Sequence, residues 1–166
     1  SKQVTTNYYK IDNKKSIKIE SVYANQYAAA GDKTLIDHLR GGENYRTGNW
    51  QGYREDLIAI VDLGEKKKVS DVSLGCMQDI KSWIFFPKNV KFFSSNDGKN
   101  FTLLGEINTV FSNKIEGSFT KDYNLKISDA KAKYIKVIAE NYGTCPDWHL
   151  GAGGKAWLFV DEIQIK

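Results

Sequence analysis

The stretch LIAIVDL, residues Leu57–Leu63, places apolar side chains on both faces of an extended chain, as a central strand does. Outward from it, turn residues separate further runs of strand-like composition, and no helical periodicity of useful length is present. These runs are Ser16–Tyr23, Val69–Met77, Asn89–Ser95, Asn100–Ile107, Phe119–Leu125, Lys133–Glu140 and Ala156–Lys166. Short strands with this spacing predict an all-β fold, an antiparallel β-sandwich of the jelly-roll type.

Length and composition indicate a single globular domain. A chain of 166 residues, of which 41% are hydrophobic and 27% charged, can bury a core without a metal or a disulfide. The net charge of +4 is small, and its tightest cluster, Lys66–Lys68, falls where a solvated turn is expected. The sequence has no basic stripe interleaved with exposed aromatics, so nucleic acid is not an expected partner.

The polar, aperiodic residues 1–15 are predicted to be a linker, which leaves residues 16–166 as the domain. The chain starts at Ser1 without an initiator Met, which indicates a piece of a longer protein. No signal peptide opens it, and no apolar run reaches transmembrane length. Its two cysteines, Cys76 and Cys145, match neither a zinc pattern nor a redox pair, and two independent thiols are favoured over a disulfide.

Three long polar loops interrupt the predicted strands, and loops of this length inside a compact domain are usually functional. They are Gly31–Tyr53, Gln78–Lys88 and Asn141–Lys155. In the first loop Asp37, Thr47 and nearby carbonyls could surround a hard cation. Trp50 and Tyr53 could present a flat face to a ligand. The alternative is an ordinary surface loop in which Asp37 caps a turn and Trp50 packs into the core.

Aromatic and short polar side chains of these loops are the candidate ligand contacts. A sugar needs an aromatic platform for its C–H face and hydrogen-bonding groups around its rim. The candidate carbohydrate-binding residues are Trp50, Tyr53, Gln78, Asp79, Trp83, Trp148 and His149. They form one site if the loops gather at one end of the sandwich. The alternative for a loop tryptophan is burial, and burial is the prediction for Trp157, which lies inside a strand.

The residues that most often carry catalysis are poorly placed for it. The two histidines, His38 and His149, lack the neighbours of a catalytic triad or a zinc site. The adjacent carboxylates Asp161 and Glu162 should point to opposite faces of a strand, so they cannot flank one bond. We therefore do not expect this chain to be an enzyme.

Four short motifs occur in the order that is typical of a known family. They are Thr34–Asp37, Val61–Gly64, Ser94–Phe101 and Phe159–Ile163. In this order the chain, over residues 16–166, resembles the discoidin domain, also called the coagulation factor 5/8 C-terminal (F5/8 type C) domain, which overlaps with carbohydrate-binding module family 32. The stretch Gly153–Ile163, GGKAWLFVDEI, is also similar to modules appended to bacterial β-hexosaminidases of the chitobiase type. The resemblance implies a non-catalytic accessory domain, covalently linked to the catalytic domain of a secreted, periplasmic or cell-surface bacterial glycoside hydrolase.

The resemblance also implies a structural calcium ion between the early Asp loop and a carboxylate near the last strand. Carried over to this sequence, the side-chain ligands are Asp37, Thr47 and Glu162, and main-chain carbonyls supply the other oxygens that calcium needs. The alternative interpretation is that Glu162 points outward from the last strand and pairs with a lysine. The chain departs from the family in two ways. Its Asp-to-Thr loop is longer, and Cys76 and Cys145 do not stand where many members join their termini by a disulfide.

The function implied by the resemblance is binding of a glycan end of the galactose, N-acetylgalactosamine or N-acetylglucosamine type. The alternative is the protein or phospholipid binding of other discoidin domains, whose lipid-binding members insert apolar loop spikes into a bilayer. The run Trp83–Phe86 could act in that way. Because it leads into Pro87 and a strand, we expect it to be partly buried, and a membrane is not an expected partner.

Overall fold

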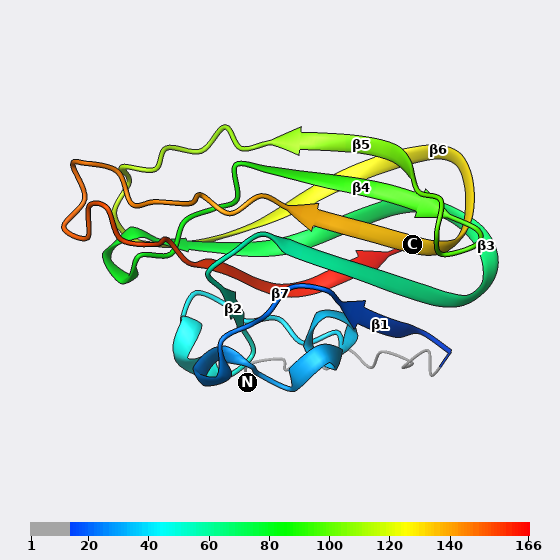
Figure 1. The fold of residues 1–166 in the computed structure, drawn as a ribbon, viewed down its shortest axis with the longest axis horizontal. Coiled ribbons are helices and arrows are strands. Elements are labelled where there is room, and N and C mark those ends of the chain that lie inside the picture. The colour runs from blue at the N-terminus through cyan, green and yellow to red at the C-terminus, as the bar shows by residue number, and fades with distance from the viewer. Residues whose placement is uncertain (1–13) are drawn as a thin grey trace, which may run out of the picture.

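The computed structural model describes residues 14–166, which form two layers of antiparallel strands with short 3-10 turns (Figure 1). The strands are β1 (Ser16–Ile19), β2 (Gln51–Tyr53), β3 (Leu57–Asp79), β4 (Asn89–Ser95), β5 (Thr102–Asn108), β6 (Ser118–Ala139) and β7 (Leu158–Ile165). The turns are η1 (Asn25–Tyr27), η2 (Gly31–Ile36), η3 (Tyr45–Thr47) and η4 (Ile80–Ser82). The predicted linker, residues 1–15, lies outside the described residues except for Lys14 and Lys15. In the part of the chain described, no helix has the length and apolar character needed to span a membrane.

Two long strands, β3 and β6, run through both layers. The first part of β3 pairs with β1 and with the end of β6, and the sheet continues through β4 to β5. The second part of β3 pairs with the start of β6 and with β7, which also pairs with β2. A register shift between Asp62 and Lys67 marks the place where β3 bends from one layer into the other, since irregularities of this kind let a strand change direction. The predicted antiparallel β-sandwich of the jelly-roll type is confirmed.

The predicted boundaries were wrong at this bend. The runs Leu57–Leu63 and Val69–Met77 belong to the single strand β3, and two further predicted strands likewise merge into β6. Lys66–Lys68, expected in a turn, lies in the mostly exposed middle of β3. The charged stretch stays extended because Lys67 and Lys68 pair with β6 across the bend.

The main core lies between the two layers and contains buried side chains of β3, β4, β6 and β7. A second cluster covers the other face of the β3–β7 layer and consists of Trp50, Met77, Ile84, Trp157 and Phe159. Tyr27, from the preceding turn η1, and Tyr45, from the first long loop, pack edge-on against Phe159 in this cluster. The second half of β3 is therefore buried on both faces, and Trp157, with 8% of its surface exposed, is in the core as predicted.

Both cysteines are free thiols, as favoured from the sequence, and both are buried. Cys76 lies in the main core on β3. Cys145 lies in a separate small cluster with Ile80, Phe85 and Ala156.

Candidate functional site

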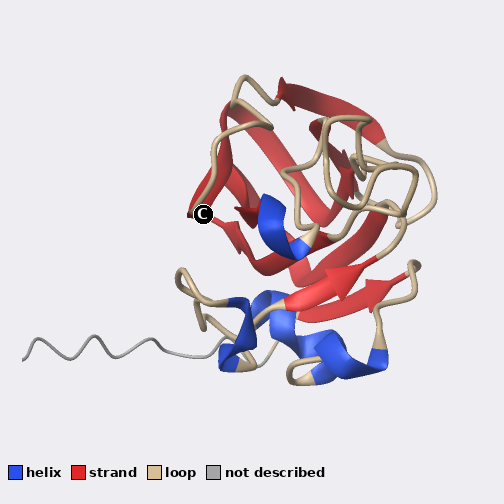
Figure 2. Ribbon diagram, turned by 90° about the vertical axis from the view of Figure 1, so that its left-hand side faces the viewer, coloured by secondary structure: helices blue, strands red, loops and turns tan. Residues whose placement is uncertain are grey.

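Only two of the three long loops meet at one end of the sandwich. The second and third loops, residues 78–88 and 141–155, gather there with the connection 109–117, at the left of Figure 1. Figure 2 views that end and has these loops crossing in front of the strands. The first loop runs along the side of the sandwich instead, where η2 contacts β7. The expectation of one site built from all three loops is therefore wrong.

The aromatic side chains of the first loop are structural. Trp50 is 1% exposed, its Nε1 donates to the Gly42 carbonyl, and its indole lies so close to Gly41 that a Cβ there would be 2.0 Å from Cε2. Tyr53 is fully buried and donates its hydroxyl to Gln51 Oε1 at 2.5 Å. Neither ring can stack on a sugar, which corrects the prediction for Trp50 and Tyr53. They hold the first loop to the sandwich.

The polar candidates of the second loop are also engaged within the protein. Gln78 is 2% exposed, and its amide donates to the Ser112 carbonyl at 2.9 Å while its Oε1 faces the Phe86 N–H at 3.5 Å. Asp79 accepts a hydrogen bond from the Ser82 hydroxyl at 3.0 Å. The predicted contact of Gln78 with a sugar is therefore wrong, because burial removes its amide from the surface.

His149 joins the second and third loops. Its Nδ1 accepts the Gly151 N–H at 2.9 Å, so Nε2 carries the proton and donates to the Ile80 carbonyl at 2.6 Å. With both nitrogens engaged and 8% of its surface exposed, His149 cannot donate to a ligand hydroxyl. The prediction that it does so is corrected, and the residue has a positioning role.

The remaining candidates, Trp83 and Trp148, lie on the walls of a pocket of about 480 Å³ at the loop end. This Trp83–Trp148 pocket is lined by Ile80, Lys81, Trp83, Lys114, Glu116, Trp148, His149 and Leu150. Trp148 is 43% exposed, and the neighbouring Leu150 projects fully into solvent. Sequence reasoning missed Lys81, Lys114, Glu116 and Leu150. Lys114 and Glu116 follow β5 in a connection without a recognisable motif.

Glycines of the third loop admit the indole of Trp83. A Cβ at Gly151 would lie 2.4 Å from Trp83 Cε2, and one at Gly154 would lie 2.6 Å from Cζ3. Trp83 itself has a φ of 64°, in the left-handed region that bulky residues rarely adopt. Such strain persists where the surroundings over-determine it, often at functional sites. The rest of the run to Phe86 is buried, with Ile84 and Phe85 at most 1% exposed, so it cannot form the membrane spike considered above.

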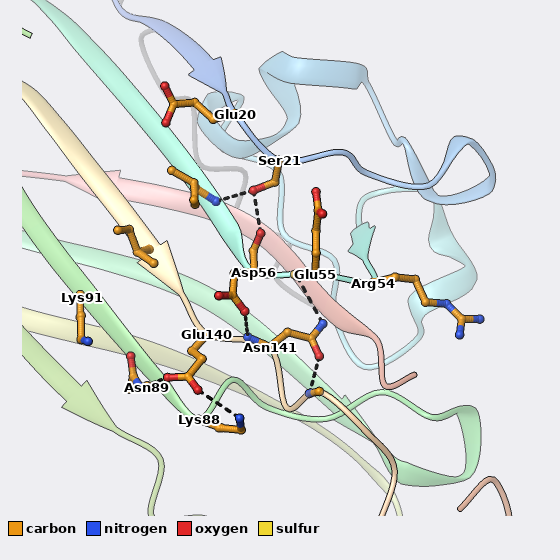
Figure 3. Close-up of a pocket in the computed structure, with 13 residues that line it drawn as sticks. Glu20, Ser21, Arg54, Glu55, Asp56, Lys88, Asn89, Lys91, Glu140 and Asn141 are labelled. Carbon is orange, nitrogen blue, oxygen red and sulfur yellow. Dashed lines mark hydrogen bonds and ion pairs between the residues drawn. The ribbon is translucent and has the colours of Figure 1, made fainter. Parts of the chain in front are cut away.

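A second pocket, of about 670 Å³, lies across the ends of β1, β3, β6 and β4 and is lined mainly by charged and amide side chains (Figure 3). Those side chains largely bond to one another. Glu140 accepts from Lys88 at 3.0 Å and from Asn89 at 2.6 Å, and Asp56 accepts the backbone N–H of Asn141 at 2.8 Å. Because its lining has no aromatic ring, it lacks the platform that a sugar needs.

A β-bulge on the last strand gathers two carboxylates at the side of the sandwich. Asp161 and Glu162 stand opposite the single residue Gly75 of β3. Glu162 Oε2 accepts the His38 N–H at 2.9 Å, and Asp161 Oδ2 accepts from Arg40 Nε at 2.8 Å. Both side chains therefore meet the same segment of the first loop, and each is 1% exposed. The bulge interrupts the strand alternation from which opposite, partly outward faces were predicted.

Each of these carboxylates keeps one buried oxygen, Asp161 Oδ1 or Glu162 Oε1, without a hydrogen-bond partner. His38 Nδ1 lies 3.7 Å from Glu162 Oε1, too far for a good hydrogen bond. Burial raises the pKa of Glu162 to about 8, and burial also raises the pKa values of Asp37 and Asp161. Unpaired buried carboxylate oxygens are costly, so a cation beside them would stabilise the fold.

The side chains predicted to bind calcium, two carboxylates and a hydroxyl, have the donor chemistry that such a cation would need. Asp37 is close enough to Glu162 to raise its pKa further by charge repulsion. Thr47 Oγ1 donates to the Gly41 carbonyl at 3.1 Å, and the Gly41 N–H donates to Asp161. In residues 14–166 no three His, Cys, Asp or Glu side chains surround a common point. A cation here would depend on hydroxyl and carbonyl oxygens beside the carboxylates, a ligand set that suits calcium better than zinc.

Comparison with known proteins agrees with this fold. The family model described as "F5/8 type C domain" matches residues 16–157. No curated protein matches the chain by sequence.

Several solved structures with the same fold come from bacterial carbohydrate-active proteins. The family 32 module of Clostridium perfringens NanJ, solved with galactose, has a TM-score of 0.60 at 15% identity, over 93% of this chain and 95% of that one. The C. perfringens module CpGH89CBM32-5, solved with GalNAc-β-1,3-galactose, has a TM-score of 0.58 at 15% identity, over 93% and 96%. The C-terminal domain of a Bacteroides fragilis chitobiase has a TM-score of 0.57 at 18% identity, over 94% and 95%.

The match of the family model covers most of the chain, and the antiparallel sandwich agrees with it. The chain belongs to the F5/8 type C (discoidin) domain family.

Proposed function

We propose that this domain is a non-catalytic carbohydrate-binding module that holds a glycan end in the Trp83–Trp148 pocket. The observation that carries the proposal is the exposure of Trp148, 43%, on the wall of a pocket between two loops at one end of the sandwich. Exposed apolar side chains that gather at a pocket, here Trp148 and Leu150, often mark a ligand-binding site. The similar modules solved with galactose and with GalNAc-β-1,3-galactose support a glycan of the galactose or N-acetylgalactosamine type. N-acetylglucosamine is the third candidate.

Binding at such a site is weak. Stacking one face of a sugar on an indole buries apolar area worth about 1–2 kcal/mol. Each hydrogen bond mostly replaces one to water and adds about 1 kcal/mol. After the cost of association, the dissociation constant is on the order of micromolar to millimolar. Weak binding is useful when the module is tethered to an enzyme, because tethering raises the local concentration of substrate.

The parent protein we propose is therefore a bacterial glycoside hydrolase of the β-hexosaminidase or chitobiase type, secreted, periplasmic or on the cell surface. The likeness to the C-terminal domain of a chitobiase supports this setting. In it, the domain supplies substrate proximity and the catalytic domain supplies the chemistry.

We further propose that Asp37, Thr47 and Glu162, with main-chain carbonyls, hold a structural calcium ion. The unpaired buried oxygen of Glu162 supports this proposal. A ligand that binds only the folded state stabilises it by mass action, so a chelator should lower the melting temperature and calcium should restore it.

Isothermal titration against galactose, N-acetylgalactosamine and N-acetylglucosamine, and against their oligosaccharides, tests the glycan proposal. We expect binding by the native domain and loss of binding in Trp148→Ala. Leu103→Ala, at an exposed apolar residue of β5, is the matched control and should bind like the native domain. If no glycan gives heat, or if Trp148→Ala binds normally, the proposed site is wrong.

A further inference from the structure

The charged groups at the Trp83–Trp148 pocket indicate the class of glycan it takes. Among the described residues that line it, the charged side chains are Lys81, Lys114 and Glu116. His149 has both ring nitrogens engaged within the protein and contributes no free acceptor. The rim therefore carries two ammonium groups and one carboxylate.

These charges do not cancel around the ring of Trp148. Lys81 Nζ pairs with Glu116 at 2.8 Å, and both side chains are about two-thirds exposed. Lys114 Nζ lies 6.0 Å from the centroid of the Trp148 ring and has no carboxylate partner in the described part of the chain. A positive charge with three donors and no acceptor thus stands beside the exposed aromatic face.

Neutral sugars present hydroxyls that both donate and accept, so a site for them usually supplies carboxylate or amide acceptors as well as donors. Here the carboxylate of Glu116 is paired through Oε2 with Lys81, and the amide of Gln78 is buried elsewhere, so the charge left unbalanced beside the ring is that of Lys114. A carboxylate or sulfate group, in contrast, presents acceptors only and forms charge-assisted bonds with an ammonium group.

We infer that the domain prefers an anionic glycan, with the sugar ring stacked on Trp148 and its carboxylate or sulfate group bound by Lys114. This inference rests on the proposed function and specifies the ligand class of the same site. Lys81 and Glu116 then set the strength of the preference, because Glu116 repels an anion whenever Lys81 does not neutralise it.

The test compares three probes by isothermal titration at low and moderate salt: a galacturonate oligosaccharide, a sulfated galactose oligosaccharide and the matching neutral galactose oligosaccharide. We expect an anionic probe to bind about fivefold tighter than the neutral one, with the difference reduced by salt. The uronate and sulfate probes separate the two sources of negative charge.

Three variants test whether the charged residues change binding in the direction that the inference requires. Lys114→Gln should weaken binding of the anionic probe by a factor of about 2 to 5, as expected for an exposed ion pair, and leave the neutral probe unchanged. Glu116→Gln should tighten the anionic probe, an effect that mere loss of structure cannot produce. Lys99→Gln, at an exposed lysine in the β4–β5 turn, is the matched control.

The outcomes separate this inference from the proposed function. If the neutral probe binds at least as tightly and Lys114→Gln changes nothing, the anionic preference is wrong while glycan binding stands. If none of the probes binds, and the neutral sugars named above also give no heat, glycan binding itself is overturned.

Discussion

Glu162 is the residue whose surroundings depend most on what binds beside it. Its Oε1 is buried without a hydrogen-bond partner, and burial raises its pKa from 4.5 to about 8. A carboxyl whose folded pKa is raised binds more protons in the folded than in the unfolded state. Its cost to stability therefore grows as pH rises from about 4.5 to about 8.

In chelator at pH 7, Glu162→Gln should raise the free energy of unfolding by about 1–3 kcal/mol, because an amide does not ionise. In calcium the same substitution should lower the melting temperature, because a ligand is lost. Thermal melts of both proteins in both buffers measure the reversal of sign. A shift in the same direction under both conditions would argue against a cation at this site.

Trp148 and Trp50 should respond in opposite ways to truncation. Trp148→Ala should remove glycan binding and cost less than about 1 kcal/mol of stability, because the ring is 43% exposed. Trp50→Ala should cost about 3–5 kcal/mol, because it empties a buried site. Urea unfolding beside glycan titration separates the two effects. Equal losses of stability in the two variants would contradict the assignment.

At the scale of elements, the third loop forms the pocket by leaving room for the indole of Trp83. Gly151→Ala would place a Cβ 2.4 Å from Trp83 Cε2, so the ring must move. We expect the glycan affinity to fall several-fold although Gly151 has no side chain to offer a ligand. Ala152→Ser, at the exposed neighbouring residue, should have no effect. Titration of both variants is the measurement, and normal affinity in Gly151→Ala would mean that the position of Trp83 is unimportant.

The β-bulge on β7 is the other element that shapes a candidate site. It turns Asp161 and Glu162 toward the first loop, where Arg40 and Gly41 bind Asp161 and the His38 N–H binds Glu162. One irregular pair of residues thus connects the last strand with a loop more than 100 positions earlier in the chain.

At the scale of the whole molecule, the labelling rates of the two free thiols can show whether the loop end opens before the core. Cys76 lies in the main core, whereas Cys145 lies in the third loop as part of a separate small cluster. Burial raises the pKa of both thiols, so neither should react in the native state. Local opening of a loop needs less free energy than global unfolding.

An alkylating reagent under native conditions should therefore label Cys145 before Cys76, and in denaturant without reductant it should label both. Mass spectrometry of timed samples gives the two rates. Labelling of Cys76 at the rate of Cys145 would mean that the loop end does not open separately from the core.

The sequence by itself determined the fold class and the family, because strand alternation, turn residues and short motifs are local patterns. For Cys76 and Cys145 it only favoured free thiols over a disulfide. It also placed Trp83 and Trp148 in loops, and the family resemblance singled out Asp37, Thr47 and Glu162 as candidate calcium ligands. Tertiary structure alone decided which loop residues face solvent. Trp50, Tyr53 and Gln78 have the composition of ligand contacts, yet segments distant in sequence bury them. Tertiary structure also decided where the β-bulge at Asp161 falls, because the register of β7 against β3 depends on strand pairing. It decided which charged side chains surround Trp148 as well, because they come from connections far apart in the chain.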